Sequence, residues 1–292
     1  MADLARIGVI GGGQMGSGIA HVAALAGIDV ALVDADEAAL GRARATIGKN
    51  LDRQVAKQEV SAGDKEAALK RIAMSRDLAA LGGCELVIEA VPEREEIKRA
   101  VFASLLPHVS PDCILASNTS SISITRLAAG TDRPEKFIGM HFMNPVPVMK
   151  LIEVIRGIAT SDATFEAVMT LGARMGKTMA VAHDFPGFIV NRILIPMINE
   201  AAYALHERVG DVTSIDAAMK LGANHPMGPL TLADLIGLDT CLEVMRVLHQ
   251  GLGDSKYRPC PLLVNYVDAG WLGRKSGRGF YDYSGSSPTP TR

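Results

Sequence analysis

The chain has 292 residues, of which 48% are hydrophobic, with 30 Lys and Arg residues against 32 Asp and Glu residues. This length is enough for one large or two ordinary domains, each with its own core. The formal net charge of −2, without a basic block or a long apolar stretch, argues against nucleic acid and against a membrane as partners.

Two features predict a cytoplasmic protein. Asp3 and Arg6 place charges where a secretory signal would run. The four cysteines are scattered, with neither a C-x-x-C pair nor a His at ligand spacing, so we expect buried free thiols in a reducing compartment, without disulfides or a metal site. They are Cys84, Cys113, Cys241 and Cys260.

The first predicted strand, residues 7–10, leads through a G-x-G-x-x-G turn into an Ala-rich helix over 14–26. In such a turn Gly11 permits the tight bend, Gly13 lets the backbone approach a pyrophosphate, and Gly16 lets the helix pack closely against the strand. The phosphates would lie at the positive end of the helix. A purely structural turn is the alternative. The predicted cofactor contacts here are Gly11, Gly12, Gly13, Gln14, Met15 and Gly16.

A second predicted strand, residues 28–33, ends in Asp34. A carboxylate at the tip of this strand is placed to accept hydrogen bonds from the adenosine ribose, and it repels a 2′-phosphate. The next three residues, 35–37, include no Arg that would bind such a phosphate. The sequence therefore predicts NAD as the cofactor, with NADP less favoured.

Aliphatic runs that alternate with helical segments predict an α/β fold with a Rossmann-type, doubly wound, mostly parallel sheet. A charged helical pair over about 37–70 is expected as an insertion beside the cofactor cleft. The link between the runs 137–140 and 151–155 is too short for a crossover helix, so these strands should be antiparallel at one edge. The other predicted strands cover residues 86–88, 113–116 and 179–182.

Beyond Pro186 and Gly187 the aliphatic strands give way to helix after helix, which predicts a second, all-α domain. We expect the NAD-binding domain to cover residues 1–185 and the helical domain to cover 186–284. The tail, residues 285–292, is rich in Ser, Pro and Thr and is expected to be disordered.

His141 follows the strand predicted over 137–140, at a carboxyl end where open α/β sheets bind ligands. Histidine suits the work of a general base, although an ordinary packed residue is the other reading. Glu153 lies among aliphatic residues, where a carboxylate is costly without a partner. If the two strands form a hairpin, Glu153 would fix the tautomer of His141 and stabilise its imidazolium; otherwise Glu153 faces solvent at a sheet edge.

Other polar residues would complete such a site. The hydroxyls of residues 117–121 follow a predicted strand and would hold a substrate oxygen or a nicotinamide amide, or cap the next helix. Asn191 lies one turn into an apolar helix at the domain boundary, and its amide needs a partner, which the cleft between the domains would supply.

Four segments, in this order, resemble the 3-hydroxyacyl-CoA dehydrogenases, and among them the short bacterial enzymes that act on 3-hydroxybutyryl-CoA. They are residues 117–120 (SNTS), 141–147 (HFMNPVP), 186–192 (PGFIVNR) and 272–281 (LGRKSGRGFY). The resemblance extends from Ile7 to Tyr283. It implies reversible, NAD-dependent oxidation of an (S)-3-hydroxyacyl-CoA to the 3-oxoacyl-CoA, with 3-hydroxybutyryl-CoA as the favoured substrate.

The resemblance also implies roles for single residues. His141 would be the base, Glu153 its orienting partner, and Ser120 and Asn191 the groups that hold substrate oxygens. Composition alone would place two of the implied NAD contacts, Glu93 and Lys98, on a helix surface. The full set of these further NAD contacts is Glu93, Lys98, Ser120, Asn144 and Lys275.

For the CoA moiety the resemblance implies contact with the helical pair. Asn50 stands near the position where the animal enzymes carry a Ser, and Lys57 is the one plausible basic partner. A free surface helix is an equal alternative for these two residues. The resemblance further implies a homodimer formed through the helical domain.

Two other functions stay open. One is a dehydrogenase of a free hydroxy acid or sugar acid on the same fold, which a comparison of acetoacetyl-CoA with free acetoacetate would separate. The other is a non-catalytic NAD-binding protein. The combination of His141, Glu153, Ser120 and Asn191 argues against the latter, because a structural module has no use for this set.

Overall fold

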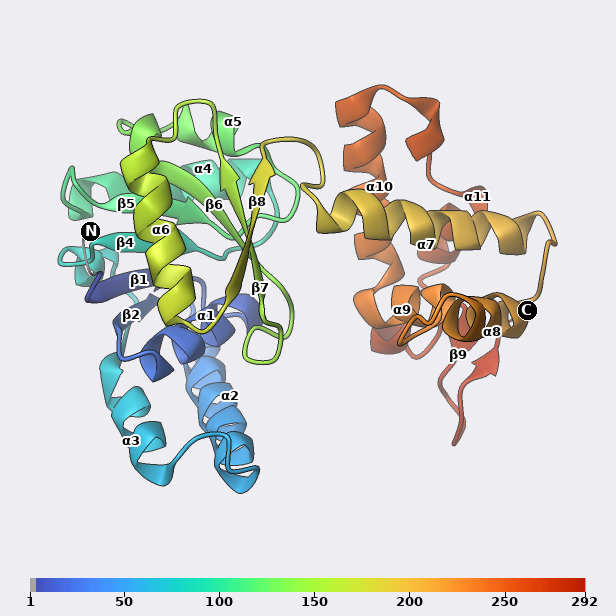
Figure 1. The fold of residues 1–292 in the computed structure, drawn as a ribbon, viewed down its shortest axis with the longest axis horizontal. Helices are drawn as coiled ribbons and strands as arrows, with labels where there is room; N and C mark the ends of the chain where they lie inside the picture. Colours follow the sequence, from blue (N-terminus) through green and yellow to red (C-terminus); the bar gives the residue numbers. More distant parts are fainter. Residues whose placement is uncertain (1–3, 292) are drawn as a thin grey trace. The chain divides into compact units, whose positions relative to one another are not determined.

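The computed structural model describes residues 4–291, so Asp3 and, in the tail, Arg292 lie outside the described part. The chain divides into two compact units, Met1–Phe185 and Pro186–Arg292 (Figure 1). Among the described residues no helix combines the length and the apolarity needed to cross a membrane.

The first unit is built on an eight-stranded sheet with the order β3-β2-β1-β4-β5-β6-β7-β8, which confirms the predicted Rossmann-type α/β fold. Neighbouring strands are parallel except for β6 and β7, which are antiparallel. The strands are β1 Arg6–Ile10, β2 Asp29–Val33, β3 Ile72–Ser75, β4 Leu86–Glu89, β5 Ile114–Ser117, β6 Phe137–Phe142, β7 Leu151–Arg156 and β8 Thr178–His183.

Two details of the sheet differ from the sequence prediction. The antiparallel pair does not form the edge, because the helix after β7 returns the chain so that β8 pairs with β7 in parallel and becomes the edge strand. Strand β3 was not predicted. It follows the helix that ends at Arg71 without a loop, and only Ile72 of its four residues is buried, so it carries no aliphatic run.

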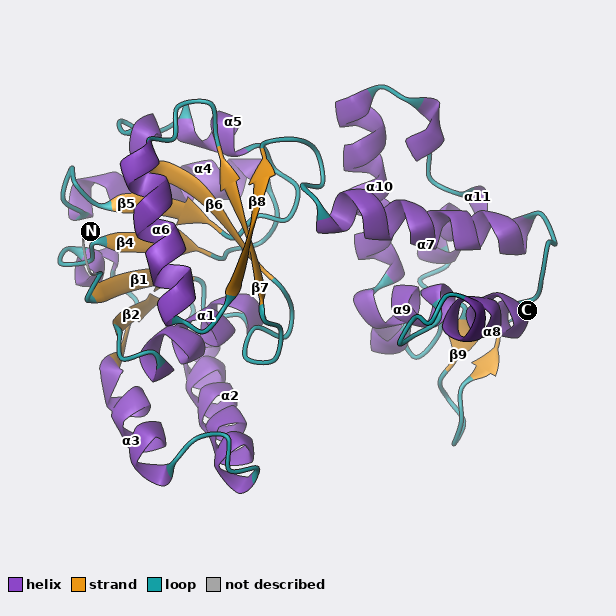
Figure 2. Ribbon diagram, viewed as in Figure 1, coloured by secondary structure: helices purple, strands orange, loops and turns teal. Residues whose placement is uncertain are grey.

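Helices cover the sheet on its two faces (Figure 2). Side chains of α1 and α6, among them Ile19 and Val168, share one hydrophobic core with the strands. The Phe102 ring of α4 packs edge-on against the Phe137 ring of β6, with centroids 4.9 Å apart. The predicted helical pair is present as α2 and α3, which pack against α1. The helices of this unit are α1 Gln14–Leu25, α2 Glu37–Ala56, α3 Ala62–Arg71, α4 Glu95–Leu105, α5 Ile124–Ala128 and α6 Asp162–Arg174.

The second unit is helical, as predicted, and has its own core, which includes Ile198, Leu242, Met245 and Phe280. Its helices are α7 Val190–His206, α8 Val212–Gly222, α9 Pro229–Ile236, α10 Leu238–Leu252 and α11 Pro261–Asp268.

The prediction of a disordered tail is wrong for its described part. Strand β10, Thr289–Pro290, pairs antiparallel with β9, Tyr281–Asp282, and the Thr291 amide donates to the Phe280 carbonyl at 2.9 Å. A composition rich in Ser, Pro and Thr offers no apolar core. It does not prevent backbone pairing with a strand whose edge is otherwise open, and Pro is tolerated on such an edge.

Candidate active site

The glycine turn joins β1 to α1 in the way that its spacing predicts. Gly11 has a φ of +110°, and a Cβ at Gly16 would lie 1.8 Å from the Gly11 carbonyl oxygen. Only glycine therefore allows this contact. A Cβ at Gly13 would meet nothing within 4 Å, and α1 begins after Gly13 without a side-chain cap. Open space at an uncapped helix N-terminus fits a pyrophosphate.

Asp34 lies beside this turn. Its Oδ2 accepts a hydrogen bond from the Gly12 amide at 2.7 Å, and its Oδ1 accepts one from the Asp36 amide at 2.9 Å. The turn and the carboxylate, 22 residues apart in the chain, thus form one end of the same site. The residues present fit the adenosine and pyrophosphate parts of a dinucleotide.

An arginine that the sequence did not place here lies next to Asp34. Arg76 follows β3, and its Nε donates to the Ala35 carbonyl at 3.2 Å. The sequence prediction, that no Arg follows Asp34 at positions 35–37, considered only residues next in the chain. The neighbouring strand β3 brings Arg76 in from the side.

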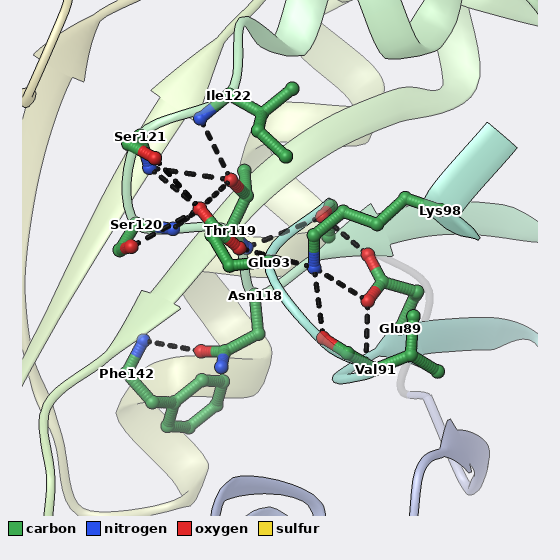
Figure 3. Close-up of polar contacts among 11 residues, drawn as sticks. Glu89, Val91, Glu93, Lys98, Asn118, Thr119, Ser120, Ser121, Ile122 and Phe142 are labelled. Atoms are coloured by element: carbon green, nitrogen blue, oxygen red, sulfur yellow. Dashed lines mark hydrogen bonds and ion pairs between the residues drawn. The ribbon is translucent and has the colours of Figure 1, made fainter. Parts of the chain in front are cut away.

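Lys98 is not a surface residue, contrary to what composition alone suggests, and Glu93, whose side chain is 35% exposed, lies before the helix and not on it. Lys98 is 1% exposed and lies on the same face of α4 as Phe102 and Leu105. Its Nζ pairs with Glu89 Oε1 at 2.7 Å and with Glu93 Oε2 at 3.3 Å (Figure 3). Glu89 was not predicted as a site residue, although an acid directly after the aliphatic residues 86–88 was the available signal.

The Glu93 carboxylate accepts hydrogen bonds from the polar loop that follows β5. Its Oε1 accepts from the Thr119 hydroxyl at 2.6 Å, the Ser120 amide at 2.8 Å and the Ser121 amide at 3.0 Å, and from the hydroxyls of both serines (Figure 3). Burial opposes the ionisation of Glu93, but Lys98 and these donors outweigh it and hold its pKa below the ordinary value. For Glu89, burial outweighs Lys98 and raises the pKa.

The predicted hairpin brings His141 and Glu153 together. The two residues are directly paired in the antiparallel register of β6 and β7. His141 Nδ1 lies 2.7 Å from Glu153 Oε2, the carboxylate side chain is fully buried, and the imidazole is 9% exposed. The structure therefore agrees with the reading in which Glu153 pairs with the imidazole of His141, and not with the one in which Glu153 faces solvent at a sheet edge.

Asn118 links the loop after β5 to the strand that carries His141. Its Oδ1 accepts a hydrogen bond from the Phe142 amide at 2.9 Å (Figure 3). Asn144 lies exposed on the connection that follows β6 and precedes a cis bond to Pro145.

Asn191 and Lys275 belong to the helical unit. Asn191 is the second residue of α7, in its first turn and not one turn into the helix as predicted. Lys275 lies in a short 3-10 helix, Arg274–Ser276, and its Nζ is 2.6 Å from the Asp239 carboxylate.

Asn50 and Lys57 lie on α2 and at its C-terminal cap. They are seven residues apart, so they share one face of the helix, with Asn50 half-buried and Lys57 exposed. Within residues 4–291, no group of His, Cys, Asp and Glu side chains is arranged to hold a metal ion.

The four thiols are free and buried. Burial raises the pKa of Cys113 and of Cys241 to about 12, which removes the thiolate that nucleophilic chemistry would need.

Comparison with known proteins gives a consistent result over the whole chain. Residues 6–185 match the NAD binding domain of 3-hydroxyacyl-CoA dehydrogenase, and residues 187–283 match its C-terminal domain. A 3-hydroxybutyryl-CoA dehydrogenase of Bradyrhizobium diazoefficiens is 64% identical over 291 residues, covering 100% of this chain and 99% of its own.

Solved structures agree. The (S)-3-hydroxybutyryl-CoA dehydrogenase of Ralstonia eutropha is 49% identical, with a TM-score of 0.94 and coverage of 97% of this chain and 100% of its own. A diketoreductase that acts on dicarbonyl compounds is more distant, at 31% identity and a TM-score of 0.83, with coverage of 97% and 100%.

Proposed function

This chain belongs to the 3-hydroxyacyl-CoA dehydrogenase family, and on that premise we propose that it interconverts an (S)-3-hydroxyacyl-CoA and the 3-oxoacyl-CoA with NAD. 3-Hydroxybutyryl-CoA is the favoured substrate, because the relatives with the higher identities carry that activity in their names. The observation that carries the chemistry is the buried contact between His141 and Glu153.

In this proposal His141 is the general acid and base. The Glu153 carboxylate has no proton to give, so at 2.7 Å it accepts the Nδ1–H of His141. Nε2 is then left with a lone pair for the hydroxyl proton of the substrate. Once His141 is protonated, Glu153 stabilises the imidazolium, as the carboxylate of a catalytic triad does. In the reverse direction His141 returns the proton to the 3-oxo oxygen.

The residues that would hold NAD are those of the glycine turn with Asp34, together with Glu93, Ser120, Asn144 and Lys275. Lys98, whose side chain is buried, would contribute through its ion pair with Glu93. When bound, NAD supplies the hydride acceptor. Asp34 favours NAD over NADP because a carboxylate repels a 2′-phosphate. Arg76 beside it would weaken this preference, because a guanidinium attracts that phosphate.

Ser120 and Asn191 would hold the substrate oxygens, and Asn50 and Lys57 would contact the CoA moiety. We further propose a homodimer through the helical unit. Ile193 on α7 is 67% exposed and Leu221 on α8 is 85% exposed, which leaves apolar side chains of this unit for a second copy to cover.

The test is the NADH-dependent reduction of acetoacetyl-CoA by the purified protein. We expect His141→Ala to lower kcat by about 10²- to 10⁴-fold, the usual worth of general acid–base catalysis, with NADH affinity nearly unchanged. His108→Ala, at an exposed histidine, is the matched control. Wild-type turnover by His141→Ala would refute the assignment.

A second comparison addresses the substrate class. Faster turnover of free acetoacetate than of acetoacetyl-CoA would favour a dehydrogenase of free acids. The absence of NADH oxidation with every acyl-CoA tested would revive a non-catalytic role.

A further inference from the structure

Glu89 and Lys98 form a buried ion pair that stability alone does not explain. Both side chains are at most 1% exposed, and their charged atoms lie 2.7 Å apart. Removing two charges from water costs several kcal/mol per ion, so that replacing a buried pair by apolar residues is often neutral or stabilising. The pair therefore suggests a role in the site that it adjoins.

The contacts of Lys98 fix the direction of its ammonium group. An ammonium has three N–H donors. Three acceptors surround the Lys98 Nζ, namely Glu89 Oε1 at 2.7 Å, Glu93 Oε2 at 3.3 Å and the Val91 carbonyl at 3.3 Å (Figure 3). Glu89 and Val91 accept hydrogen bonds from the ammonium, and Glu93 forms an ion pair with it.

Glu89 is itself held from several sides. Its Oε1 also accepts the Val91 amide at 2.7 Å, and its Oε2 accepts the Ser117 hydroxyl at 2.6 Å. These bonds tie the end of β4 to the end of β5, and they leave Glu89 little freedom to follow a movement of Lys98.

Glu93 connects this pair to the polar loop. One of its oxygens faces Lys98, and the other receives the hydroxyl and amide donors of residues 119–121. The line of contacts from Glu89 through Lys98 and Glu93 therefore ends at Ser120, which the proposed function places against the substrate.

We propose that Glu89 is a positioning residue for the dehydrogenase reaction. It directs the Lys98 ammonium, which fixes the carboxylate of Glu93, and Glu93 orders the loop of residues 119–121 so that Ser120 is in place. This role rests on the function proposed above and adds to it a residue that acts only through others.

The first test is Glu89→Gln, which keeps the shape and removes the charge. Lys98 then moves toward Glu93, its remaining carboxylate, and disturbs the bonds between Glu93 and the loop. We expect kcat with acetoacetyl-CoA to fall about 10-fold or more, since a misplacement of about 1 Å can cost about 100-fold. We also expect faster hydrogen exchange at the Ser120 and Ser121 amides, which donate to Glu93.

Glu95→Gln is the matched control. Glu95 opens the same helix and pairs with Arg99 and Arg126 outside the network, so this variant should leave kcat and the two amides unchanged. If Glu89→Gln matches the wild type in kcat and in amide exchange, the proposal is overturned.

The double variant Glu89→Gln/Lys98→Met separates positioning from stability. Without either charge, positions 89 and 98 hold no uncompensated buried ion, and the partly exposed Glu93 keeps the donors of residues 119–121, so the melting temperature should return toward the wild-type value. Glu93 still lacks its ammonium, so kcat should stay as low as in Lys98→Met alone. A double variant that regains wild-type kcat along with its stability would show that the pair is only structural.

Failure of the proposed function gives a different result. A wild-type protein without activity on any acyl-CoA would refute the reaction. The exchange of the Ser120 and Ser121 amides in Glu89→Gln would still decide whether Glu89 orders the loop.

Discussion

The buried carboxylates of the two units have different kinds of partner. In the sheet unit, Glu153 faces the imidazole of His141 and Glu89 faces the ammonium of Lys98. In the helical unit, Asp234 is held by the amides of Phe280 and Tyr281 and by a tyrosine hydroxyl. A carboxylate paired with a side chain that carries or takes up a proton is equipped for chemistry. One that is surrounded by amides and hydroxyls is equipped to hold a fold.

Asp216 follows the same rule as Asp234. It accepts from the amides of Leu230 and Thr231 and from the Tyr281 hydroxyl. These two aspartates tie the segment around Tyr281 to α8 and α9. Burial, together with the nearby Asp234 carboxylate, raises the pKa of Tyr283 to about 12, so that this hydroxyl stays a donor at neutral pH.

The largest effect should come from Glu153→Gln, which tests the chemical side of the comparison. The amide keeps a hydrogen-bonding group next to His141 but cannot stabilise its imidazolium, so we expect kcat to fall by about 10²- to 10⁴-fold. Steady-state kinetics measures this loss, and NADH titration should show nearly unchanged affinity. A kcat within a few-fold of the wild type would place Glu153 with the structural carboxylates.

The structural side is tested by Asp234→Ala. This change leaves one buried donor, the Phe280 amide, and two half-buried donors without their acceptor, so we expect the free energy of unfolding to fall by about 2–4 kcal/mol, as measured by urea denaturation. Asp268→Ala, at an exposed aspartate that ends α11 in the same unit, should keep the wild-type midpoint. Equal midpoints for the two variants would contradict the structural role.

The smallest effect concerns His21, a buried histidine whose partner is an amide and not a carboxylate. Its Nε2 lies 2.8 Å from Gln54 Oε1, and burial lowers its pKa below the ordinary 6.5. Above about pH 6.5 His21 is neutral in both the folded and the unfolded chain and has no effect on stability. Below that pH the unfolded chain binds the proton more readily, so the free energy of unfolding falls as the pH drops toward the lowered pKa.

The measurement for His21 is urea denaturation across pH 5–8, with His21→Gln as the comparison. We expect this variant to lose less stability than the wild type between pH 7 and pH 5, because glutamine takes up no proton when the chain unfolds. Parallel profiles for the two proteins would show that His21 does not contribute to the acid sensitivity.

The fold and the site could be predicted from the sequence where local signals and strand-pairing rules agree. The glycine spacing and Asp34 predict the first strands and their turn because Gly11 and Gly16 have local steric reasons, a positive φ and a close approach to a carbonyl oxygen. The contact between His141 and Glu153 was predictable because a short link demands a hairpin, and a buried carboxylate demands a partner.

The remaining features depend on neighbours that are distant in the chain. Lys98 reads as a surface residue until β4 supplies Glu89 as its partner, although its spacing from Phe102 already puts it on the buried face of α4. Arg76 reaches the tip of β2 only because β3 lies beside it, and that edge strand carries too few buried residues to be read from the sequence.

The connection between Phe142 and Leu151 is a largely exposed loop, anchored in the core by Val146, that should not tolerate insertions or deletions. A change of one residue that reaches the strands would slide the pairing by one position and turn Glu153 to the opposite face of the sheet, away from His141. The loop has little slack to absorb such a change, because Lys177 donates to the carbonyls of Val146 and Met149. The length of this surface loop should therefore vary less among functional relatives than its residues do.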